Sequence, residues 1–411
     1  MNKQKYIFNL LLPKKKKHVY PLLNKGLSQQ DLNQGIKVLK TGNITMNRFT
    51  YLFEKEFTKK INVKYAVMVN SGSSANLIAT FASCNPLRKN RFKKGDEAII
   101  PVLCWSTSLW PLVQAGLKIK FVDVNPKTLN ANAEDIISHI SRKTKVILLV
   151  NVLGLSTQVD KIRNICFKKK IILIEDNCES LGTKFKNKFL GTFGDFGTFS
   201  FFYSHPISSG EGGMVVCNNK SDYEILKSLR SHGWSRDKKI SIKYPDLDPR
   251  YIFINSGFNL RPTDIQAAIA SRQLKKLKKM QKIRFQNKNR IISYLKKSKN
   301  WNNQFKFIDP PKEFDPSYMV FPILLNPIFK NKKKKIINYL EFNGLETRPI
   351  ISGSFVNQPS AKIYKLNLKK KFFKGAQKIQ DLGFVIGLHT QNINKKKLRF
   401  LEKILLSINE I

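Results

Sequence analysis

The sequence predicts an α/β fold: a large domain built on a mainly parallel sheet, followed by a smaller C-terminal α+β domain. Short apolar runs rich in Val and Ile recur at intervals of about 20 to 30 residues, as strands buried on both faces do in βαβ units. Each run ends in polar or turn residues. The pattern then changes to a long helical stretch and a mixed C-terminal part. With 411 residues, 42% of them hydrophobic, the chain can build two cores.

In the first part, five apolar runs are expected to be strands. They are residues 65–70, 97–102, 118–124, 146–153 and 171–176. Ligands in such sheets gather beyond the carboxyl ends of the strands. The residues that close these runs are therefore the candidates for chemistry.

The later part begins with residues 262–294, which have helical periodicity and no internal Pro or Gly, and predict one or two long helices. A strand-like run at 319–325, a helical segment at 332–343, an Asn-Gly turn and a final amphipathic helix at 395–408 follow. We divide the chain into a basic N-terminal extension (1–19), a large domain (20–285) and a small domain (286–411).

The charge is extreme: 74 Lys and Arg against 28 Asp and Glu give a formal net charge of +46. Such a charge raises nucleic acid, an anionic membrane or a phosphate-bearing substrate as partners. The basic residues are spread over the whole length, without a stripe interleaved with stacking aromatics, so no nucleic-acid partner is expected. A solvated, compositionally biased surface explains the charge best.

Five scattered cysteines, with no CxxC pair, argue against a disulfide framework and favour the cytoplasm. The N-terminal apolar run at 6–12 is too short for a membrane span, and a lysine cluster follows it where a signal peptide has small residues. No membrane span is expected.

Three stretches carry candidate chemistry. The first is Ser71-Gly72-Ser73-Ser74, between the first strand and an apolar helical stretch. Hydroxyls, a glycine that permits close backbone approach and the unpaired amides of a helix start can form a phosphate cup. The alternative is a simple helix-capping turn.

The second stretch is Glu175-Asp176, which closes the fifth predicted strand. A carboxylate there can accept a hydrogen bond from a protonated ring nitrogen and keep it charged, which makes a pyridine ring an electron sink. The alternative is a helix cap after the strand.

The third stretch is 198–213, TFSFFYSHPISSGEGG, within a 31-residue window (189–219) that contains no Lys or Arg. Ser200 and Ser204 offer hydroxyls to a phosphate, and His205 titrates near neutrality. The alternative is a structural or surface histidine.

Together and in this order, VNSGSSAN, LIEDNCES and GTFGDFGTFSFFYSH resemble the DegT/DnrJ/EryC1/StrS family of nucleotide-sugar aminotransferases, which are fold type I pyridoxal phosphate enzymes. The resemblance covers about residues 20–411. In that family a lysine lies five residues after the phosphate-binding serine and ahead of a Gly-Gly pair. Here the serine is Ser200, the pair is Gly212-Gly213, and His205 occupies the position of the lysine.

The resemblance implies a change of reaction. The family's lysine holds the cofactor aldehyde as a Schiff base, whereas imidazole forms no stable imine and leaves an acid/base beside a non-covalently held cofactor. The lysine-to-histidine change marks the sugar 3-dehydratase branch. One type in that branch needs an iron–sulfur cluster held by cysteines in the C-terminal half, but no cysteine follows Cys217. No metal or iron–sulfur cluster is therefore expected.

The other type acts on GDP-4-keto-6-deoxy-D-mannose in the synthesis of colitose for the O-antigen of lipopolysaccharide. The resemblance thus implies a lyase that takes an amino group from L-glutamate to make pyridoxamine 5'-phosphate, and then removes the sugar's 3-hydroxyl. Two alternatives stay open. One is a perosamine-synthase-like aminotransferase that uses a remote lysine, and the other is a non-catalytic basic binding protein on this scaffold.

The resemblance also implies a role for each site residue. The cofactor-binding set is Ser73, Ser74 and Ser200 for the phosphate, Trp105 stacked on the ring, Asp176 on the ring nitrogen, Glu179 on the ring's oxygen side, and Asn259 from the partner subunit of a homodimer. His205, with Ser204, is implied as the catalytic acid/base.

His232 and Arg348 are implied to face the substrate, with a packed turn and a structural ion pair as their respective alternatives. One departure is Pro206, where close relatives have histidine. Proline fixes φ and removes a backbone donor beside the implied catalytic group.

Overall fold

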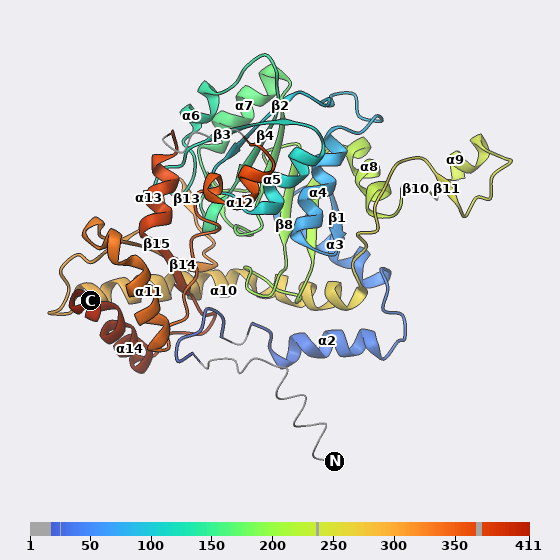
Figure 1. Ribbon diagram of the computed structural model, residues 1–411. Coiled ribbons are helices and arrows are strands. Elements are labelled where there is room, and N and C mark those ends of the chain that lie inside the picture. The colour runs from blue at the N-terminus through green and yellow to red at the C-terminus, as the bar shows by residue number, and fades with distance from the viewer. Residues whose placement is uncertain (1–17, 25, 236–237, 367–371) are drawn as a thin grey trace, which may run out of the picture.

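A seven-stranded sheet forms the centre of the protein in the computed structural model, which describes residues 18–24, 26–235, 238–366 and 372–411 (Figure 1). The strand order is β1-β9-β8-β5-β4-β2-β3; β9 runs antiparallel to both neighbours and the other pairs are parallel. The strands are β1 (Tyr65–Val69), β2 (Glu97–Pro101), β3 (Lys118–Val122), β4 (Thr144–Val150), β5 (Ile172–Asp176), β8 (Phe196–Ser200) and β9 (Gly213–Cys217). Most of the predicted extension, residues 1–17, lies outside the described residues.

The five strands predicted from apolar runs are confirmed as β1 to β5. Their burial explains the run pattern: every residue of β5 is buried, as are all but the first of β1 and β2. The prediction did not name β8 and β9 as strands, because glycines and hydroxyl residues interrupt their apolar character. These two strands bracket the loop that carries His205.

Helices cover both faces of the sheet and connect its strands. They are α2 (Gln29–Leu39), α3 (Arg48–Ile61), α4 (Gly72–Ser83), α5 (Ser106–Gln114), α6 (Ala133–Ser138), α7 (Val159–Lys169), α8 (Lys220–Arg230), α9 (Lys238–Lys243), α10 (Asp264–Lys296), α11 (Lys333–Phe342), α12 (Pro359–Ile363), α13 (Lys374–Leu382) and α14 (Lys395–Leu406). The long helix predicted at 262–294 is the 33-residue α10. Thr263 and Gln266 form a capping box at its start.

The C-terminal part has its own antiparallel sheet, in the order β12-β14-β15. Its strands are β12 (Phe305–Phe307), β14 (Val320–Leu325) and β15 (Gly383–Gly387). A second hydrophobic cluster forms here from side chains of this sheet, α11, α14 and the end of α10. Figure 1 shows α10 running beneath both sheets, and the predicted boundary between residues 285 and 286 falls inside this continuous helix.

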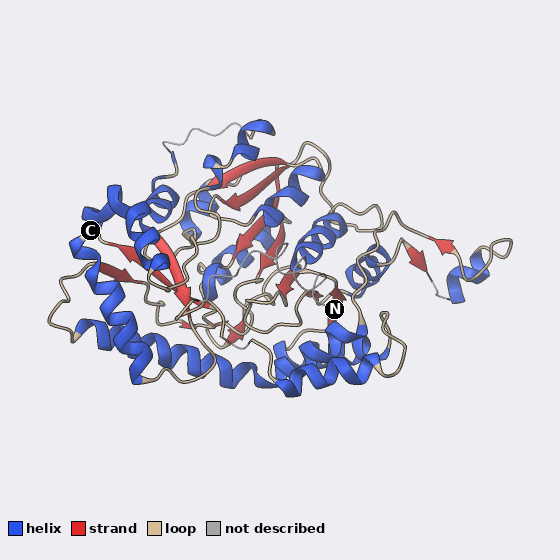
Figure 2. Ribbon diagram, turned by 60° about the horizontal axis from the view of Figure 1, so that its bottom comes forward, coloured by secondary structure: helices blue, strands red, loops and turns tan. Residues whose placement is uncertain are grey.

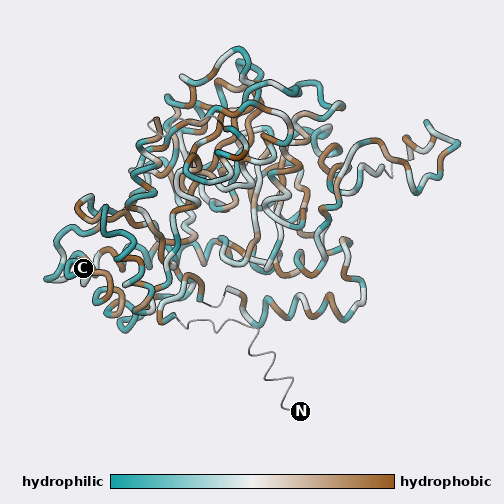
Figure 3. The backbone as a smooth tube through the Cα atoms, viewed as in Figure 1, coloured by the Kyte–Doolittle hydropathy of each residue, from teal (hydrophilic) through white to brown (hydrophobic). Residues whose placement is uncertain are grey.

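Hydrophobic segments gather on the central strands, and hydrophilic ones on the outer loops and helices (Figure 3). An arm formed by β10 (Trp234–Ser235), α9 and β11 (Ile252–Phe253) projects from the body (Figure 2). Short β-segments complete the fold: β6 (Lys184–Phe185), β7 (Lys188–Phe189) and β13 (Phe314–Asp315). Among the described residues, no helix combines the length and the apolar character that crossing a membrane requires.

Candidate active site

Two adjacent buried carboxylates end β5, and they serve different partners. Glu175 accepts hydrogen bonds from the backbone amides of Gly191, Phe193 and Gly194, at 2.7 to 2.8 Å. Burial raises the pKa of Glu175, and these amides act in the opposite direction. Because successive strand residues point to opposite faces, Asp176 faces the other side. Glu175 therefore supports the loop that enters β8.

Asp176 is buried and held by three donors. Its Oδ2 accepts hydrogen bonds from Asn76 Nδ2 and Ser108 Oγ, both at 2.7 Å, and its Oδ1 accepts one from the Cys178 amide at 3.1 Å. Thr198 Oγ1 donates to Asn76 Oδ1 at 2.6 Å, which fixes the orientation of the amide. The aspartate is thus fixed in direction by residues from α4, α5 and β8.

The start of α4 forms a hydroxyl-rich turn. Ser71 is the helix N-cap, and its Oγ accepts a hydrogen bond from the Ser74 amide at 3.1 Å. Ser74 Oγ donates to Asn70 Oδ1 at 2.6 Å. Ser73 is exposed, and its hydroxyl donates to Thr107 at 3.0 Å. The capping turn that we kept as an alternative is present, and the helix start it builds presents backbone amides of the kind that bind anions.

Gly72 brings this turn against the end of β8. A Cβ added at Gly72 would lie 2.4 Å from Ser200 Cβ, 2.9 Å from Ser200 Oγ and 3.0 Å from Cys178 Sγ. Only a glycine permits that approach. The first and third candidate stretches, which are far apart in the sequence, therefore meet at Gly72 and Ser200, beside the strand that ends in Asp176.

His205 lies in a tight turn of the loop that joins β8 to β9. Its backbone amide donates to the Phe202 carbonyl at 3.0 Å, and the two rings pack edge to face at 5.7 Å. The buried Nδ1 has no hydrogen-bond partner among the described residues. Burial lowers the pKa of His205 to about 4, while the charge of Asp176 and the backbone of Ser200 and Cys178 oppose that shift. The imidazole is therefore neutral at neutral pH and lies within the electrostatic influence of Asp176.

Glu179, near Asp176, is half-buried. Its Oε2 accepts a hydrogen bond from the Leu153 amide at 3.2 Å. Burial raises the pKa of Glu179 to about 7, and the charge of Asp176 adds to the effect. Leu153 has a left-handed backbone, φ 51°, so its amide is aimed at Glu179 by a strained turn. Near pH 7 this side chain can either donate or accept a hydrogen bond.

Trp105 is the N-cap residue of α5 and is 57% exposed. Ser108, in the first turn of the same helix, donates to Asp176. Ser204 is half-buried in the same turn as His205. An exposed aromatic face is what a stacked planar ligand requires.

His232 and Asn259 lie next to each other on the connection between α8 and α10. The His232 amide donates to the Phe258 carbonyl at 2.7 Å, and its ring packs edge to face on Trp234 at 5.5 Å. Asn259 is exposed and accepts a hydrogen bond from Arg261 Nε at 3.1 Å. The packed turn that we kept as the alternative for His232 is present. No described contact joins either side chain to Asp176 or His205 of the same chain.

Arg348 is exposed and pairs with Glu346 at 2.8 Å, so the alternative of a structural ion pair is also met. The segment after it reaches the site region, because Ser352 Oγ donates to the Cys104 carbonyl at 2.7 Å, one residue before Trp105. Arg348 itself has no described contact with His205.

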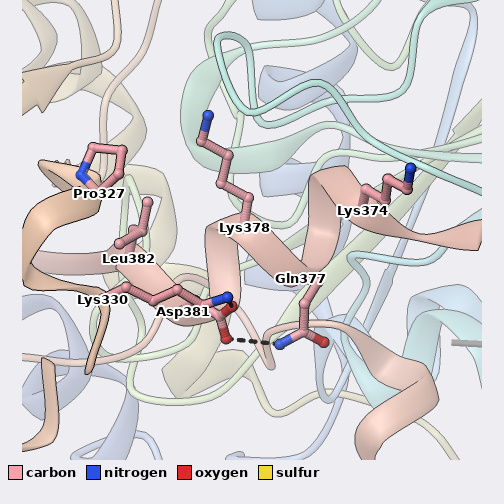
Figure 4. Close-up of a pocket in the computed structure, with 7 residues that line it drawn as sticks. All are labelled: Pro327, Lys330, Lys374, Gln377, Lys378, Asp381 and Leu382. Atoms are coloured by element: carbon pink, nitrogen blue, oxygen red, sulfur yellow. Dashed lines mark hydrogen bonds and ion pairs between the residues drawn. The ribbon is translucent and has the colours of Figure 1, made fainter. Parts of the chain in front are cut away.

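A cavity of about 580 Å³ lies elsewhere, between the segment around Pro327 and α13 (Figure 4). Lys330, Lys374 and Lys378 contribute to its lining, and Asp381 pairs with Lys330 at 3.2 Å. None of the predicted site residues lines it.

Sequence reasoning missed Asn76, Ser108 and Thr198, which orient Asp176. Asn76 stood within the quoted SGSSAN stretch, so its motif was a usable signal. Thr198 likewise stood at the start of the quoted stretch 198–213, whereas Ser108 gave no signal, since its contact depends on how α5 packs against β5.

Residues 26–399 match the DegT/DnrJ/EryC1/StrS aminotransferase family. The chain belongs to this family. It is 35% identical over 377 residues to GDP-4-keto-6-deoxy-D-mannose 3-dehydratase of Escherichia coli O55:H7, covering 90% of this chain and 95% of that protein. The mostly parallel sheet with helices on both faces confirms the predicted fold type I class.

Two solved structures extend the comparison. The structure of the E. coli GDP-4-keto-6-deoxy-D-mannose 3-dehydratase with bound hydrated PLP superposes with a TM-score of 0.84 at 32% identity, covering 95% of this chain and all (100%) of that one. A GDP-4-keto-6-deoxymannose 3-dehydratase with a trapped PLP–glutamate geminal diamine gives 0.83 at 32% identity, covering 94% and 100%. Family membership and fold therefore agree.

Proposed function

We propose that this protein is a pyridoxal phosphate-dependent 3-dehydratase of a nucleotide-linked 4-keto-6-deoxyhexose, GDP-4-keto-6-deoxy-D-mannose, with L-glutamate as amino donor. The observation that carries the proposal is the imidazole of His205, whose buried Nδ1 has no hydrogen-bond partner among the described residues, at the family's lysine position and within the electrostatic influence of Asp176. The relatives compared above support the sugar nucleotide and glutamate.

The residues fit the cofactor. The close approach of Gly72 and Ser200 makes a cradle that a Cβ would fill. We propose that the α4 start with Ser73, Ser74 and Ser200 holds the phosphate, that Asp176 pairs with the ring nitrogen, and that Trp105 covers the ring. When bound, pyridoxal phosphate accepts an amino group and, once aminated, draws electrons from an attached substrate.

His205 is proposed to move the protons. A neutral Nδ1 without a partner can accept a proton, and the nearby carboxylate Asp176 stabilises the imidazolium that results. The same ring can then return the proton as a general acid when the 3-hydroxyl leaves as water. Ser204 stands beside it, and Glu179, with its pKa raised to about 7, is suited to the ring's oxygen side.

We propose a homodimer in which Asn259 reaches the site of the partner. The projecting arm supports this, because it exposes Ile242 (79%), Leu247 (52%), Tyr251 (58%) and Phe253 (57%), side chains that a second copy would cover. His232 and Arg348 are proposed to meet the substrate in that assembly, where Arg348 can exchange Glu346 for an anionic group. A sedimentation mass of one chain would contradict the homodimer.

Two further proposals concern organisation and place. The chain would act as a large domain (20–285) and a small domain (286–411) that meet within α10. The reaction would take place in the cytoplasm, which the five unpaired cysteines favour.

Mass spectrometry of the product made from GDP-4-keto-6-deoxy-D-mannose and glutamate tests the function. We expect a product that has lost one oxygen, together with free ammonia. Exchange of the keto oxygen for an amine would identify an aminotransferase instead. Borohydride treatment of the resting enzyme gives an independent check: a covalent pyridoxyl–lysine adduct would contradict the dehydratase.

A further inference from the structure

Arg284, in the middle of α10, is a buried cation that binds two backbone carbonyls. Its Nη1 donates to Pro206 at 3.0 Å and its Nε to Leu388 at 3.2 Å. Its side chain is 2% exposed, and no carboxylate of the described residues forms an ion pair with it. Burial lowers the pKa of Arg284 to about 10, which still leaves it charged at neutral pH.

Burying a guanidinium without a carboxylate is costly, because carbonyl dipoles only partly replace the lost water. That cost must be offset by what the arginine holds in place. Both carbonyls belong to loops with no regular pairing of their own, so the contacts order segments that the sheets do not order. An apolar side chain in place of Arg284 would avoid the penalty of removing a charge from water, so a contribution to stability alone does not explain the arginine.

The first carbonyl belongs to the residue after His205. Pro206 has no N–H, so its carbonyl is the backbone group by which this residue can be anchored. On the other side of His205, the turn is closed by the bond from its amide to Phe202. The imidazole thus stands between two fixed points, the turn at Phe202 and the guanidinium of Arg284.

The second carbonyl belongs to Leu388, the residue after β15. β15 is also the strand whose Val385 exchanges backbone hydrogen bonds with Arg348, at 2.8 and 3.1 Å. Arg284 therefore connects the loop of His205 to the strand beside a proposed substrate residue. Figure 1 shows how α10 passes beneath both sheets and so can carry this link.

We propose that Arg284 is a positioning residue: it fixes the His205 loop against the end of β15. It thereby sets the position of the imidazole in the site and keeps water away from the ring. The inference rests on the proposed function, because it is His205 as acid/base whose placement matters. Pro206, where the sequence departs from close relatives, supplies the carbonyl through which Arg284 acts.

Asn287 provides a matched control. It lies one turn further along α10, is 1% exposed, and donates to the carbonyls of His389 at 3.0 Å and Gln391 at 2.8 Å. It holds the same C-terminal segment as Arg284 but has no described contact with the His205 loop. If Arg284 acted only by holding the C-terminal segment, Asn287→Ala and Arg284→Ala would have the same effect on His205.

The decisive readout is the titration of His205 in the apoprotein. Histidine-selective labelling gives five ring signals at most, and His205→Asn assigns the one of interest. The groups that act on the His205 pKa, the charge of Asp176 and the backbone of Ser200 and Cys178, are unchanged in all these variants. We expect Arg284→Ala to raise the His205 pKa by about one unit or more, because the freed loop admits water. Asn287→Ala should leave it unchanged.

Rescue separates positioning from folding. Dilute guanidinium, well below denaturing concentrations, should occupy the space left in Arg284→Ala and restore the His205 titration. Arg284→Lys, which keeps the charge but loses the two-carbonyl fork, should fall between the wild type and the alanine variant. If Arg284→Ala does not fold, the lysine variant carries the same measurement.

In the holoenzyme, the rate constant for consuming the pyridoxal absorbance with glutamate should fall about tenfold to hundredfold in Arg284→Ala, with little change in KM for glutamate. An unchanged His205 titration in the folded arginine variants would overturn the inference. If the wild-type enzyme fails to deoxygenate the sugar nucleotide, the proposed function fails, but the apoprotein titration still decides whether Arg284 positions His205.

Discussion

Asn76 donates a 2.7 Å hydrogen bond to Asp176 across 100 residues of sequence. The Asn76 amide cannot rotate by about 180° without losing this bond and a second one, because its oxygen accepts a hydrogen bond from Thr198 at 2.6 Å. Asp176 is thus presented to the site in one orientation by a chain of buried polar side chains. Removing one member of such a network lowers the free energy of unfolding by more than an average hydrogen bond contributes, because the remaining polar groups stay buried without a partner.

Asn76→Ala should lower the free energy of unfolding by about 1–3 kcal/mol, because it leaves Thr198 and Asp176 each short of a buried partner. Denaturant unfolding of the apoprotein measures this. Asn33→Ala, which removes an exposed asparagine bonded to Gln29 within α2, should change it by less than about 0.5 kcal/mol. Equal effects of the two variants would contradict the account of Asp176.

Replacing each of the two carboxylates of β5 by its amide should affect different properties: the stability of the apoprotein for Glu175 and the affinity for the cofactor for Asp176. Glu175→Gln replaces an oxygen that accepts backbone amides with an NH₂ group, and should destabilise the apoprotein by about 2–3 kcal/mol. Asp176→Asn should destabilise it less but weaken cofactor binding about tenfold or more, equivalent to about 1.4 kcal/mol. Unfolding curves and fluorescence titration with pyridoxal phosphate compare the pair; a stronger effect of Glu175→Gln on cofactor affinity than on stability would reverse the assignment.

Stability should depend on pH through His205. Its folded pKa, about 4, lies below the ordinary value of 6.5, so between these pH values the unfolded chain binds the extra proton. The contribution of the neutral His205 to the free energy of unfolding is fully present above pH 6.5 and is lost as the pH falls through 4. Relative to His205→Asn, the apoprotein should therefore lose up to about 1.4 kcal/mol per pH unit on acidification through this window. Parallel pH profiles for the two proteins would show that His205 is not buried in the neutral form.

Much of the large sheet follows from sequence pattern, since strands buried on both faces have no polar side to obscure their apolar runs. Asp176 stood out because it closes such a run, and Ser200 and His205 because they lie in the window 189–219 that contains no Lys or Arg. The contacts of Arg284 could not be predicted, because one arginine among 74 basic residues is distinguished only by where α10 places it. For the same reason, the packed surroundings of His232 and the Glu346 partner of Arg348 appeared only in the folded chain.

Gly72→Ala should damage the cofactor site more than the fold. The new methyl group would meet Ser200 Cβ at 2.4 Å, so either α4 or the end of β8 must move, at a cost of about 1–3 kcal/mol. We expect weaker binding of pyridoxal phosphate than in the wild type. Gly26→Ala, where the three atoms nearest to the new methyl group belong to the flexible Leu23 side chain, is the control. Wild-type cofactor affinity in Gly72→Ala would show that this contact does not shape the phosphate site.

The central claim is that the imidazole at position 205 performs the proton transfers of deoxygenation. The most direct measurement is a single turnover of His205→Asn loaded with pyridoxamine 5'-phosphate and mixed with GDP-4-keto-6-deoxy-D-mannose, with exposed His139→Asn as the control. We predict that His205→Asn retains the cofactor but forms the deoxygenated sugar at least about 100-fold more slowly, while His139→Asn matches the wild type. Deoxygenation by His205→Asn at the wild-type rate would contradict the account.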